Sequence, residues 1–452
     1  MKSVDFLIIG GSATGTTAAE VIRSLKLDSS IVIVTDEDHE EYSRVLLPHY
    51  IRHKVNREQI FLKNSDWYNH KNIELVKGAR AIGLEPKSHS VKVSSGEEYK
   101  YGKLLIAIGG YVIKHPAPGA DLENILYMRT VEDADKIIEV AKKSKKGVIV
   151  GGGFIGLEFC SCFKKNGVDD VTVLVKEPYY WQGKLDEQSS RVLQQTLERN
   201  GVKVLTNEEV VEFRGSTPKA EEVASGVEPL TVITKSGKTL EANVVGIGIG
   251  IRSDLSWLEG SGIKINQAIV TNEFLETSLP DVYAAGDCAE FKDVIFDRQH
   301  IMGNWANATS QGSAVGKTMS GQRAVFETAS SYSINYFDPS TSSGPGGGFC
   351  SFIGVTDEKF ADEVVSRGSV EEGKMTRIFI KGFTSRGSTP KADEKASGVE
   401  PLKDQLRVVG ATVINDPSQV ASLTMAVRNK VGVSEYKEKL TDQSFDLREI
   451  IS

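Results

Sequence analysis

The sequence predicts an α/β protein in which one strand–glycine turn–helix unit occurs twice, followed by a smaller α+β domain. Three observations predict this fold. An apolar strand runs into glycines and then a helix at residues 6–15 and again at residues 148–158, and from residue 332 onward the pattern changes to short strands separated by turn residues. The 452 residues are enough for about two to four domains.

The first unit starts at the N-terminus. A strand is expected at residues 4–9, and a helix at residues 16–25 follows Gly10 and Gly15. Glycines at these positions let the backbone approach a pyrophosphate, which sits on the N-terminus of the helix. Ser12 stands at the middle glycine of the Gly-x-Gly-x-x-Gly pattern, and serine is small enough to keep the site while weakening the signal.

Two further strands belong to this unit. The strand expected at residues 31–35 ends in Asp36 and Glu37, and an acid at this point binds a ribose hydroxyl in dinucleotide sites. A buried strand is expected at residues 103–108 and ends at Gly109. The first unit is therefore predicted to hold a dinucleotide.

The second unit repeats the pattern with Gly151, Gly153 and Gly156. After its second strand, Lys176 suits a 2′-phosphate and Glu177 suits a bare ribose hydroxyl, so the choice between NADH and NADPH stays open. Two dinucleotides in one chain indicate hydride transfer from a nicotinamide to a flavin. The elements expected here are helices at residues 130–143 and 157–166 and strands at residues 171–175 and 244–249.

The last third of the chain adds one strand to this pattern and then a separate domain. The added strand ends in Gly286 and Asp287 and leads into a helix or loop. Residues 338–348 are rich in Pro, Ser and Gly and predict a linker or hairpin loop. Strands are then expected at residues 349–355, 375–380 and 406–414, before further helices.

One sequence element occurs twice. Residues 214–230 recur at residues 386–402 with almost the same sequence, and each copy lies between two strand-like runs where a hairpin turn would suffice. Each copy is rich in Pro, Gly, Ser, Lys and Glu and has little to bury. We interpret the copies as insertions tolerated in surface loops, since doubling a loop's length costs only about 0.6 kcal/mol. A duplicated binding motif is the alternative.

Composition excludes several classes of function. The chain is 40% hydrophobic and 25% charged, with a net charge of −7, which argues against binding nucleic acid or an anionic membrane surface. Apolar runs fall well short of the roughly 20 residues that span a bilayer. Because a strand is expected from residue 4, we expect no signal peptide and a cytoplasmic protein.

The cysteines predict neither a disulfide nor a metal site. The chain has four, Cys160, Cys162, Cys288 and Cys350, without a Cys-x-x-Cys pair or a His/Cys cluster at zinc spacing. Cys160 and Cys162 are two residues apart on an expected helix and so do not face each other. Small buried thiols are expected at all four positions.

Four markers in order, at residues 10–15, 105–109, 151–158 and 283–287, resemble those of the FAD-dependent pyridine nucleotide-disulfide oxidoreductases of the glutathione-reductase fold. The resemblance is closest to the branch without a redox disulfide. That branch includes rubredoxin and ferredoxin reductases, apoptosis-inducing-factor-like proteins and the flavin-binding part of nitrite reductases. The resemblance covers residues 1 to about 330 well and the C-terminal domain more loosely.

The resemblance implies two Rossmann-like domains, for FAD and NAD(P), and a C-terminal α+β domain that serves as a dimer or partner interface. The FAD-binding domain would be split by the NAD(P)-binding domain. The implied boundaries are residues 1–120 and 251–330 for the FAD-binding domain, 121–250 for the NAD(P)-binding domain and 331–452 for the interface domain.

The resemblance also implies roles for individual residues. Asp287 would bind the ribityl–phosphate region of FAD, Asp36 or Glu37 would bind the adenosine ribose, and Arg44 would lie near the FAD phosphates or ring. The implied FAD-binding residues are Gly10, Ser12, Ala13, Gly15, Asp36, Glu37, Arg44, Ala107, Gly109, Gly286 and Asp287. The implied NAD(P)H-binding residues are Gly151, Gly153, Phe154, Ile155, Gly156 and Lys176.

Three further residues are implied to act around the reacting rings. Glu158 would touch the carboxamide of the nicotinamide, and Trp305 would stack close to the flavin at the start of a helix whose N-terminus stabilises negative charge on the reduced ring. His49 stands where many electron-transferring relatives have a lysine, which leaves the partner of a nearby glutamate open. Val45 stands where related oxidases and disulfide reductases place a catalytic cysteine, so thiol chemistry is not expected there.

The implied activity is hydride transfer from NAD(P)H to FAD, without a redox-active disulfide. Electrons would then pass to a small redox protein, rubredoxin- or ferredoxin-like, or to a small-molecule acceptor. Two alternatives stay open: an NAD(P)H oxidase that uses oxygen, and a redox-sensing flavoprotein whose C-terminal domain binds a partner.

Overall fold

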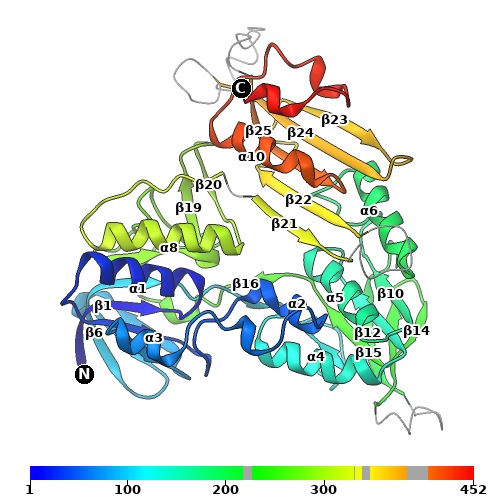
Figure 1. Cartoon of the computed structure of the whole chain (residues 1–452). Coiled ribbons are helices and arrows are strands. Elements are labelled where there is room, and N and C mark those ends of the chain that lie inside the picture. The colour runs from blue at the N-terminus through cyan, green and yellow to red at the C-terminus, as the bar shows by residue number, and fades with distance from the viewer. Residues whose placement is uncertain (217–226, 330, 338–346, 384–405, 452) are drawn as a thin grey trace. The chain divides into compact units, whose positions relative to one another are not determined.

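The computed structural model describes residues 1–216, 227–329, 331–337, 347–383 and 406–451. The chain forms two compact units, and Figure 1 labels their elements. The first unit comprises Met1–Leu46, Val55–Tyr111 and Ile251–Thr328, and the second comprises Leu47–Lys54, Val112–Gly250 and Ala329–Ser452. The short strands β7 (Tyr111–Val112) and β16 (Ile251–Arg252) lie where the chain passes from one unit to the other.

A mixed sheet forms the centre of the first unit, in the order β3-β2-β1-β6-β5-β4, with β18 also pairing with β6. The long strand β6 pairs with the antiparallel β5 in its first half and with the parallel β18 in its second half. The carboxyl ends of β2, β1, β6 and β18 therefore meet at one edge. The strand bounds are β1 Lys2–Ile9, β2 Ile31–Val34, β3 Glu74–Val76, β4 Ala81–Glu85, β5 Ser90–Val93, β6 Glu98–Ile106 and β18 Val282–Ala284.

Both faces of this sheet are buried, as is typical of parallel strands. Along β1, Phe6 and Ile8 pack with the helices on one face, whereas Leu7 and Ile9 pack in a second cluster on the other face. The helices are α1 (Ala13–Leu25), α3 (Ser65–His70) and α8 (Trp305–Met319).

Helices α1 and α8 lie side by side although almost 300 residues separate them in sequence (Figure 1). The contact is close because α8 carries Gly312 and Gly316 on the face toward α1. A Cβ added to Gly312 would lie 2.6 Å from the carbonyl oxygen of Thr14, and one added to Gly316 would lie 2.9 Å from that of Ala18. The late helix is therefore fixed against the first turn of α1.

Smaller elements complete the first unit. A three-stranded sheet comprises β17 (Ile269–Val270), β19 (Ala289–Asp293) and β20 (Arg298–His300). The 3₁₀ helices are η1 Arg44–Leu46, η2 Glu58–Ile60, η3 Pro86–Ser88, η4 Ser256–Leu258 and η5 Gly286–Cys288.

The second unit contains a parallel five-stranded sheet in the order β11-β10-β9-β15-β8. A three-stranded antiparallel sheet, β12-β13-β14, shares its hydrophobic core. The strand bounds are β8 Ile125–Leu126, β9 Lys146–Val150, β10 Asp170–Leu174, β11 Val202–Leu205, β12 Val210–Gly215, β13 Leu230–Thr234, β14 Thr239–Ala242 and β15 Val244–Ile247. The helices are α2 Leu47–Ile51, α4 Val131–Lys143, α5 Phe154–Lys165 and α6 Glu187–Arg199.

The C-terminal part of the chain belongs to the second unit and forms an antiparallel sheet in the order β21-β22-β25-β24-β23. Helix α10 (Val420–Arg428) packs on β22 and β25. The strand bounds are β21 Ser331–Asn335, β22 Phe349–Gly354, β23 Glu363–Ser369, β24 Lys374–Gly382 and β25 Leu406–Ile414, and the 3₁₀ helices are η7 Pro417–Gln419, η8 Lys439–Thr441 and η9 Leu447–Ile450. The four-part domain division inferred from sequence stays a prediction.

Two expected helix starts were wrong, each by three residues. The helices were expected from residues 16 and 157, but α1 begins at Ala13 and α5 begins at Phe154. We expected each helix to begin after the last glycine of its pattern, Gly15 or Gly156. The N-cap residues are instead Ser12 and Gly153, so Gly15 and Gly156 lie in the first turn of their helices. By contrast, the start of α4 is confirmed: Thr130 and Asp133 form a reciprocal capping box.

The duplicated element lies largely outside the described residues, which omit residues 217–226 and 384–405. The strands on either side are described. β12 pairs antiparallel with β13, and β24 pairs antiparallel with β25. Each copy thus connects two neighbouring antiparallel strands, as expected for an insertion at a hairpin.

Candidate dinucleotide sites

The first glycine turn leaves no room for side chains. Gly10 has a φ of +118°, and an added Cβ would lie 2.2 Å from the carbonyl oxygen of Ala107 at the end of β6. A Cβ on Gly15 would lie 1.9 Å from the carbonyl oxygen of Gly10. These contacts require glycine and bring the ends of β1 and β6 and the start of α1 together, which forms a backbone cradle of the kind that binds a pyrophosphate.

The N-terminus of α1 has the electrostatics of an anion site. Ser12 is its N-cap, but within the described part of the chain the Ser12 side chain makes no capping hydrogen bond, and the first turn holds no acidic residue. In contrast, Asp186 caps α6, whose first turn contains Glu187. The backbone N–H groups and the positive end of the α1 dipole are therefore left for a ligand, beginning at Ala13.

At the end of β2, Glu37 is held by two neighbours. Arg44 pairs with its Oε1, and the Tyr42 hydroxyl donates to its Oε2 over 2.6 Å. Arg44 Nη1 also donates to the Tyr42 hydroxyl over 2.7 Å. Both carboxylate oxygens of Glu37 are thus engaged, and the charge of Arg44 is balanced by Glu37.

Asp36 differs from its neighbour. It is exposed, and its Oδ2 accepts a hydrogen bond from the Tyr111 hydroxyl. No described residue donates to its Oδ1. Of the two acids that the sequence left open as ribose ligands, Asp36 therefore keeps acceptor capacity for a ligand.

Asp287 lies at the same edge of the first unit. It follows β18 in η5, where Gly286 has a φ of +82° and a Cβ would lie 2.5 Å from Thr14 Oγ1 in α1. Across from it, a Cβ on Gly303 would lie 3.6 Å from the Asp287 carboxyl carbon. The structure thus brings together the first glycine turn, Asp287 and the start of α8.

The start of α8 carries Trp305 as its first residue. The Trp305 side chain is half-buried, and the preceding Asn304 accepts a hydrogen bond from the Asn307 backbone N–H over 2.8 Å. Gln311, two turns later, accepts from the Gly286 backbone N–H over 2.6 Å. This helix is thus tied to the loop that carries Asp287.

The second glycine turn repeats the contacts of the first. Gly151 has a φ of +119°, and an added Cβ would lie 2.4 Å from the carbonyl oxygen of Gly248, while one on Gly156 would lie 2.2 Å from that of Gly151. Ile155 fills the space beside Gly248. Because these close glycine contacts are the same as in the first turn, the second turn also suits a pyrophosphate.

Two side chains cover this second turn. The buried Tyr180 donates to the carbonyl oxygen of Gly153 over 3.3 Å. Phe154, the first residue of α5, packs edge-to-face on Trp181 with 4.4 Å between ring centroids. Phe154 also contacts Tyr332 of the C-terminal sheet, with 4.8 Å between centroids. Aromatic side chains thus pack together at the start of α5, next to the second glycine turn.

The end of β10 leaves the dinucleotide preference open. Lys176 and Glu177 follow this strand and form a loose ion pair, with 3.8 Å between Lys176 Nζ and Glu177 Oε1. The Lys176 side chain is 69% exposed. Both side chains can reorient at little cost.

Beside the second turn lies a buried ion pair that the sequence did not predict. Arg52 is 4% exposed, and its Nη1 donates to Glu158 Oε2 over 2.7 Å and to Ser161 Oγ over 2.8 Å. Its Nε and Nη2 are buried without a hydrogen-bond partner among the described residues. Both partners belong to the second unit.

Burial and Arg52 act on Glu158 in opposite directions. Burial raises the pKa of Glu158 to about 7, and the Arg52 guanidinium works against this rise. The carboxyl group therefore titrates near neutral pH.

Arg52 answers the question that His49 left open in the sequence. It lies three residues after His49 at the end of α2, one helical turn along, and pairs with Glu158. Burial, with Arg52 and Lys54, lowers the pKa of His49. The one sequence signal for Arg52 was its distance of three residues from His49, because residues three apart on a helix lie on the same face.

All four cysteines lie within the described residues, and they are free and buried, as expected. Burial raises the pKa of Cys288 to about 12 and raises those of the other three thiols as well. Thiolate chemistry is therefore suppressed at each position. In the described ranges, no three His, Cys, Asp or Glu side chains gather to hold a metal ion, and no helix is long and apolar enough to cross a membrane.

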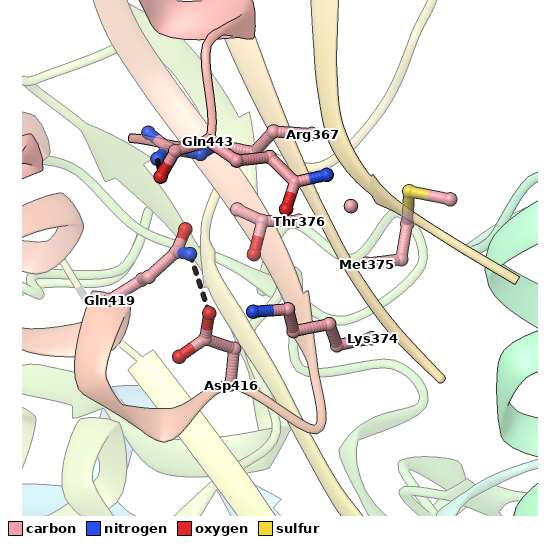
Figure 2. Close-up of a pocket in the computed structure, with 8 residues that line it drawn as sticks. Arg367, Lys374, Met375, Thr376, Asp416, Gln419 and Gln443 are labelled. Atoms are coloured by element: carbon pink, nitrogen blue, oxygen red, sulfur yellow. Dashed lines mark hydrogen bonds between the residues drawn. The ribbon is translucent and has the colours of Figure 1, made fainter. Parts of the chain in front are cut away.

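A small polar pocket lies on the C-terminal sheet (Figure 2), and its lining residues, numbered between 367 and 443, belong to neither glycine turn. The buried Arg367 lines it and donates from Nη2 to the carbonyl oxygens of Gln443 and Phe445, each over 2.9 Å. The cavity volume is about 50 Å³. Ligand pockets usually enclose roughly 300–1,000 Å³, so this one cannot accept a dinucleotide.

Residues 4–312 match the model of the pyridine nucleotide-disulphide oxidoreductases. The chain belongs to this family. An NADH oxidase of Methanocaldococcus jannaschii is 30% identical over 329 residues, which cover 71% of each chain. A nitrite reductase [NAD(P)H] of Bacillus subtilis is 30% identical over 297 residues, 66% of this chain and 36% of that enzyme. The chain thus spans little more than a third of the length of this relative.

Solved structures support the fold. In a covalent putidaredoxin reductase–putidaredoxin complex, a chain superposes with a TM-score of 0.83 at 23% identity, covering 100% of this chain and 99% of that one. A ferredoxin reductase of Rhodopseudomonas palustris gives a TM-score of 0.82 at 22% identity, covering 99% and 100%. The predicted family and the α/β fold of glutathione-reductase type are confirmed, and family membership assigns FAD as the cofactor.

Proposed function

We propose that the protein is an FAD-dependent NAD(P)H oxidoreductase that delivers electrons to a small redox protein without a redox-active disulfide. One observation carries this proposal: the two units contain glycine turns with the same close backbone contacts, at Gly10 and Gly15 in one and at Gly151 and Gly156 in the other. Family membership supports FAD as the cofactor, and we assign one turn to FAD and the other to NAD(P)H.

In the first unit, we assign the chain's residues to FAD. The N-terminus of α1, with Ser12 and Ala13, binds the pyrophosphate, and Asp36 accepts from the ribose hydroxyls. Asp287 binds the ribityl–phosphate region beside the start of α8. The supporting observation is that Asp287 and α8 both return to the first turn.

When bound, FAD supplies a flavin ring that accepts two electrons as a hydride from the nicotinamide and passes them on. The chain's own residues orient and shield the reactants. The dipole of α8 stabilises negative charge near its N-terminus, where Trp305 stands. Glu158 accepts a hydrogen bond from the carboxamide, and Arg52 holds the carboxylate in place.

The second turn, with Phe154 and Ile155, binds the pyrophosphate of NAD(P)H. Lys176 and Glu177 contact the adenosine ribose and decide between NADH and NADPH. The exposure of the Lys176 side chain supports this role, since a substrate must enter and leave.

For the acceptor, the names of relatives support a redox protein. An NADH-rubredoxin oxidoreductase of Clostridium acetobutylicum is 28% identical over 326 residues. Burial of every cysteine supports direct electron transfer from the flavin. We place the C-terminal sheet at a homodimer or partner interface, and the free thiols support a reducing compartment such as the cytoplasm.

A second candidate function is NAD(P)H oxidation by oxygen. The Methanocaldococcus relative named NADH oxidase favours it. Val45, which is exposed, stands where oxidases that use a thiol place their cysteine, and this argues against it.

The test is anaerobic reduction of the purified protein with NADH and with NADPH, followed by oxygen, peroxide, ferricyanide or rubredoxin. We expect a yellow protein whose flavin is reduced and then reoxidised rapidly by the one-electron acceptors. Rapid oxygen consumption would favour the oxidase instead. A protein without flavin would refute both functions.

A further inference from the structure

Tyr111 and Asp36 form a contact that the family pattern does not assign. Tyr111 is the last residue of the first unit before the chain crosses to the second, and its hydroxyl donates to Asp36 Oδ2. They come from different strands, since Asp36 follows β2 and Tyr111 begins β7. The Tyr111 side chain thus reaches the carboxylate that we assign to the ribose of FAD.

A second interaction fixes the Tyr111 ring. The Arg80 guanidinium carbon lies 4.9 Å from the ring centroid, and Arg80 is itself paired with Asp254. A cation over the face of an aromatic ring is attracted to the negative charge of that face. Tyr111 remains 36% exposed, so it can still meet a ligand.

The neighbouring acid shows why this contact matters. Glu37 has both oxygens engaged by Tyr42 and Arg44, whereas Asp36 receives one hydrogen bond from the described residues, on Oδ2. An ionised carboxylate has about four lone-pair sites, so Asp36 can accept from Tyr111 and from ribose hydroxyls at the same time. The contact therefore orients Asp36 without saturating it.

We propose that Tyr111 is a positioning residue of the adenosine subsite: it orients Asp36 toward the ribose hydroxyls, and its ring, held by Arg80, forms a wall of the subsite. The inference rests on the proposed function, because it takes Asp36 as the ribose ligand of FAD. Burial and Asp36 raise the pKa of Tyr111, so its hydroxyl remains a donor at neutral pH.

The experiment measures the FAD affinity of the full chain after removal of flavin, by titration with FAD. Tyr111→Phe removes the donor and keeps the ring, and Asp36→Ala removes the acceptor. Tyr99→Phe is the matched control, since the Tyr99 hydroxyl also donates to a carboxylate of the first unit, that of Glu97, over 3.1 Å.

Hydrogen bonds to charged groups contribute about 1.5–3 kcal/mol, so Asp36→Ala, which loses the bonds to the ribose hydroxyls, should weaken FAD binding roughly 100-fold. Tyr111→Phe keeps that carboxylate and loses only its orientation, so it should weaken FAD binding less, roughly 10-fold. The double variant should be no weaker than Asp36→Ala, because Tyr111 acts through Asp36. Tyr99→Phe should leave the affinity unchanged.

Two results would overturn the inference while leaving the proposed function intact. One is an unchanged affinity in Tyr111→Phe with a loss in Asp36→Ala. The other is full additivity in the double variant, which would mean that Tyr111 does not act through Asp36. An unchanged affinity in Asp36→Ala would overturn the inference together with the ribose assignment, and a chain that binds no FAD would overturn the proposed function itself.

Discussion

The two glycine turns have the same backbone but different chemistry around it. Gly10 and Gly151 have nearly the same φ, and each packs against the carbonyl oxygen of a neighbouring strand end. At the end of the next strand, however, the first turn has a hydrogen-bonded network around Glu37, whereas the second has a loose ion pair between the exposed Lys176 and the half-buried Glu177. A hydrogen-bonded network suits a resident cofactor, and an exposed side chain suits a substrate that exchanges.

The helices that follow the turns differ in the same sense. At the fifth residue, α1 has the neutral Thr17, whereas α5 has Glu158 in a buried pair with Arg52. A neutral side chain adds no charge to a site that only holds its ligand. If NAD(P)H binds at the second turn, as we propose, the titratable carboxylate of Glu158 lies beside the dinucleotide that donates the hydride. The protonation state of Glu158 can then affect the reaction.

We expect the largest effect from a negative charge at the N-cap of the helix that follows the first glycine turn, α1. Ser12→Asp should weaken FAD binding at least about 100-fold, because the carboxylate takes the N–H groups and repels the pyrophosphate. Asp is a favoured N-cap residue, so the helix itself should be preserved. FAD content per chain and a titration with FAD measure the effect.

Gly153→Asp is the matched change in the second turn, where an added Cβ meets no described atom within 4 Å. It should keep FAD and lose NADH affinity to a similar degree. The neutral controls are Ser12→Ala and Gly153→Ser. Loss of FAD in Gly153→Asp with retention in Ser12→Asp would reverse the assignment of the two turns.

The next effect concerns the buried pair. Arg52→Met leaves Glu158 without its cation, and breaking such a pair costs about 3–5 kcal/mol of unfolding free energy when the carboxylate stays charged. Chemical denaturation well above pH 8, where Glu158 stays charged without Arg52, measures this cost. Glu158→Gln in the same background should restore much of the stability, since it removes the buried charge, and failure to restore it would refute an energetic coupling of the pair.

The pH dependence of flavin reduction sharpens this prediction. Burial raises the pKa of Glu158 from 4.5 to about 7, so its contribution to stability is full below pH 4.5 and is lost as the pH rises to about 7. The rate of flavin reduction by NADH should change with pH around 7, the pKa of Glu158. Arg52→Met should move that transition upward by roughly one pH unit or more, and Glu158→Gln should abolish it. An unshifted transition would assign it to another group.

Lys176→Glu should have a smaller effect, because the side chain is exposed. If Lys176 meets a 2′-phosphate, NADPH affinity should fall about tenfold while NADH affinity changes little. The comparison of Kd for the two dinucleotides measures this. Equal losses for both would reject a phosphate contact.

The smallest effect is expected from the duplicated element. Replacing the connections between Gly215 and Leu230 and between Gly382 and Leu406 with short hairpin turns should leave flavin reduction unchanged. The unfolding free energy should change by only about 1 kcal/mol, since loop length has a weak effect. Loss of flavin reduction in a folded variant would make the element a functional motif.

The glycine turns could be predicted from the sequence because their spacing is a local backbone requirement. Residues 10–15 and 151–156 show φ values and contacts that alanine would disrupt, and these follow from short-range geometry. The helix starts were predicted three residues too late, because the glycines indicate a turn but do not show which residue is the N-cap of the helix.

Arg52 and Tyr111 could not be predicted, because their contacts join distant segments. Arg52 reaches Glu158 across 106 residues, and Tyr111 reaches Asp36 across 75. Neither residue belongs to a marker of the family pattern. The one local signal is the helical spacing of Arg52 from His49, and nothing local to Tyr111 indicates Asp36 as its partner. Long-range side-chain pairs of this kind depend on tertiary packing.

The most direct test of the central claim is anaerobic rapid mixing of the FAD-loaded protein with NADH or NADPH, recorded through the flavin absorbance. The account predicts rapid bleaching whose rate saturates with the better dinucleotide. It also predicts that Gly153→Asp, with its full content of FAD, requires far higher concentrations to reach the same rate. Bleaching with an unchanged concentration dependence in Gly153→Asp, or no bleaching in the native protein, would contradict it.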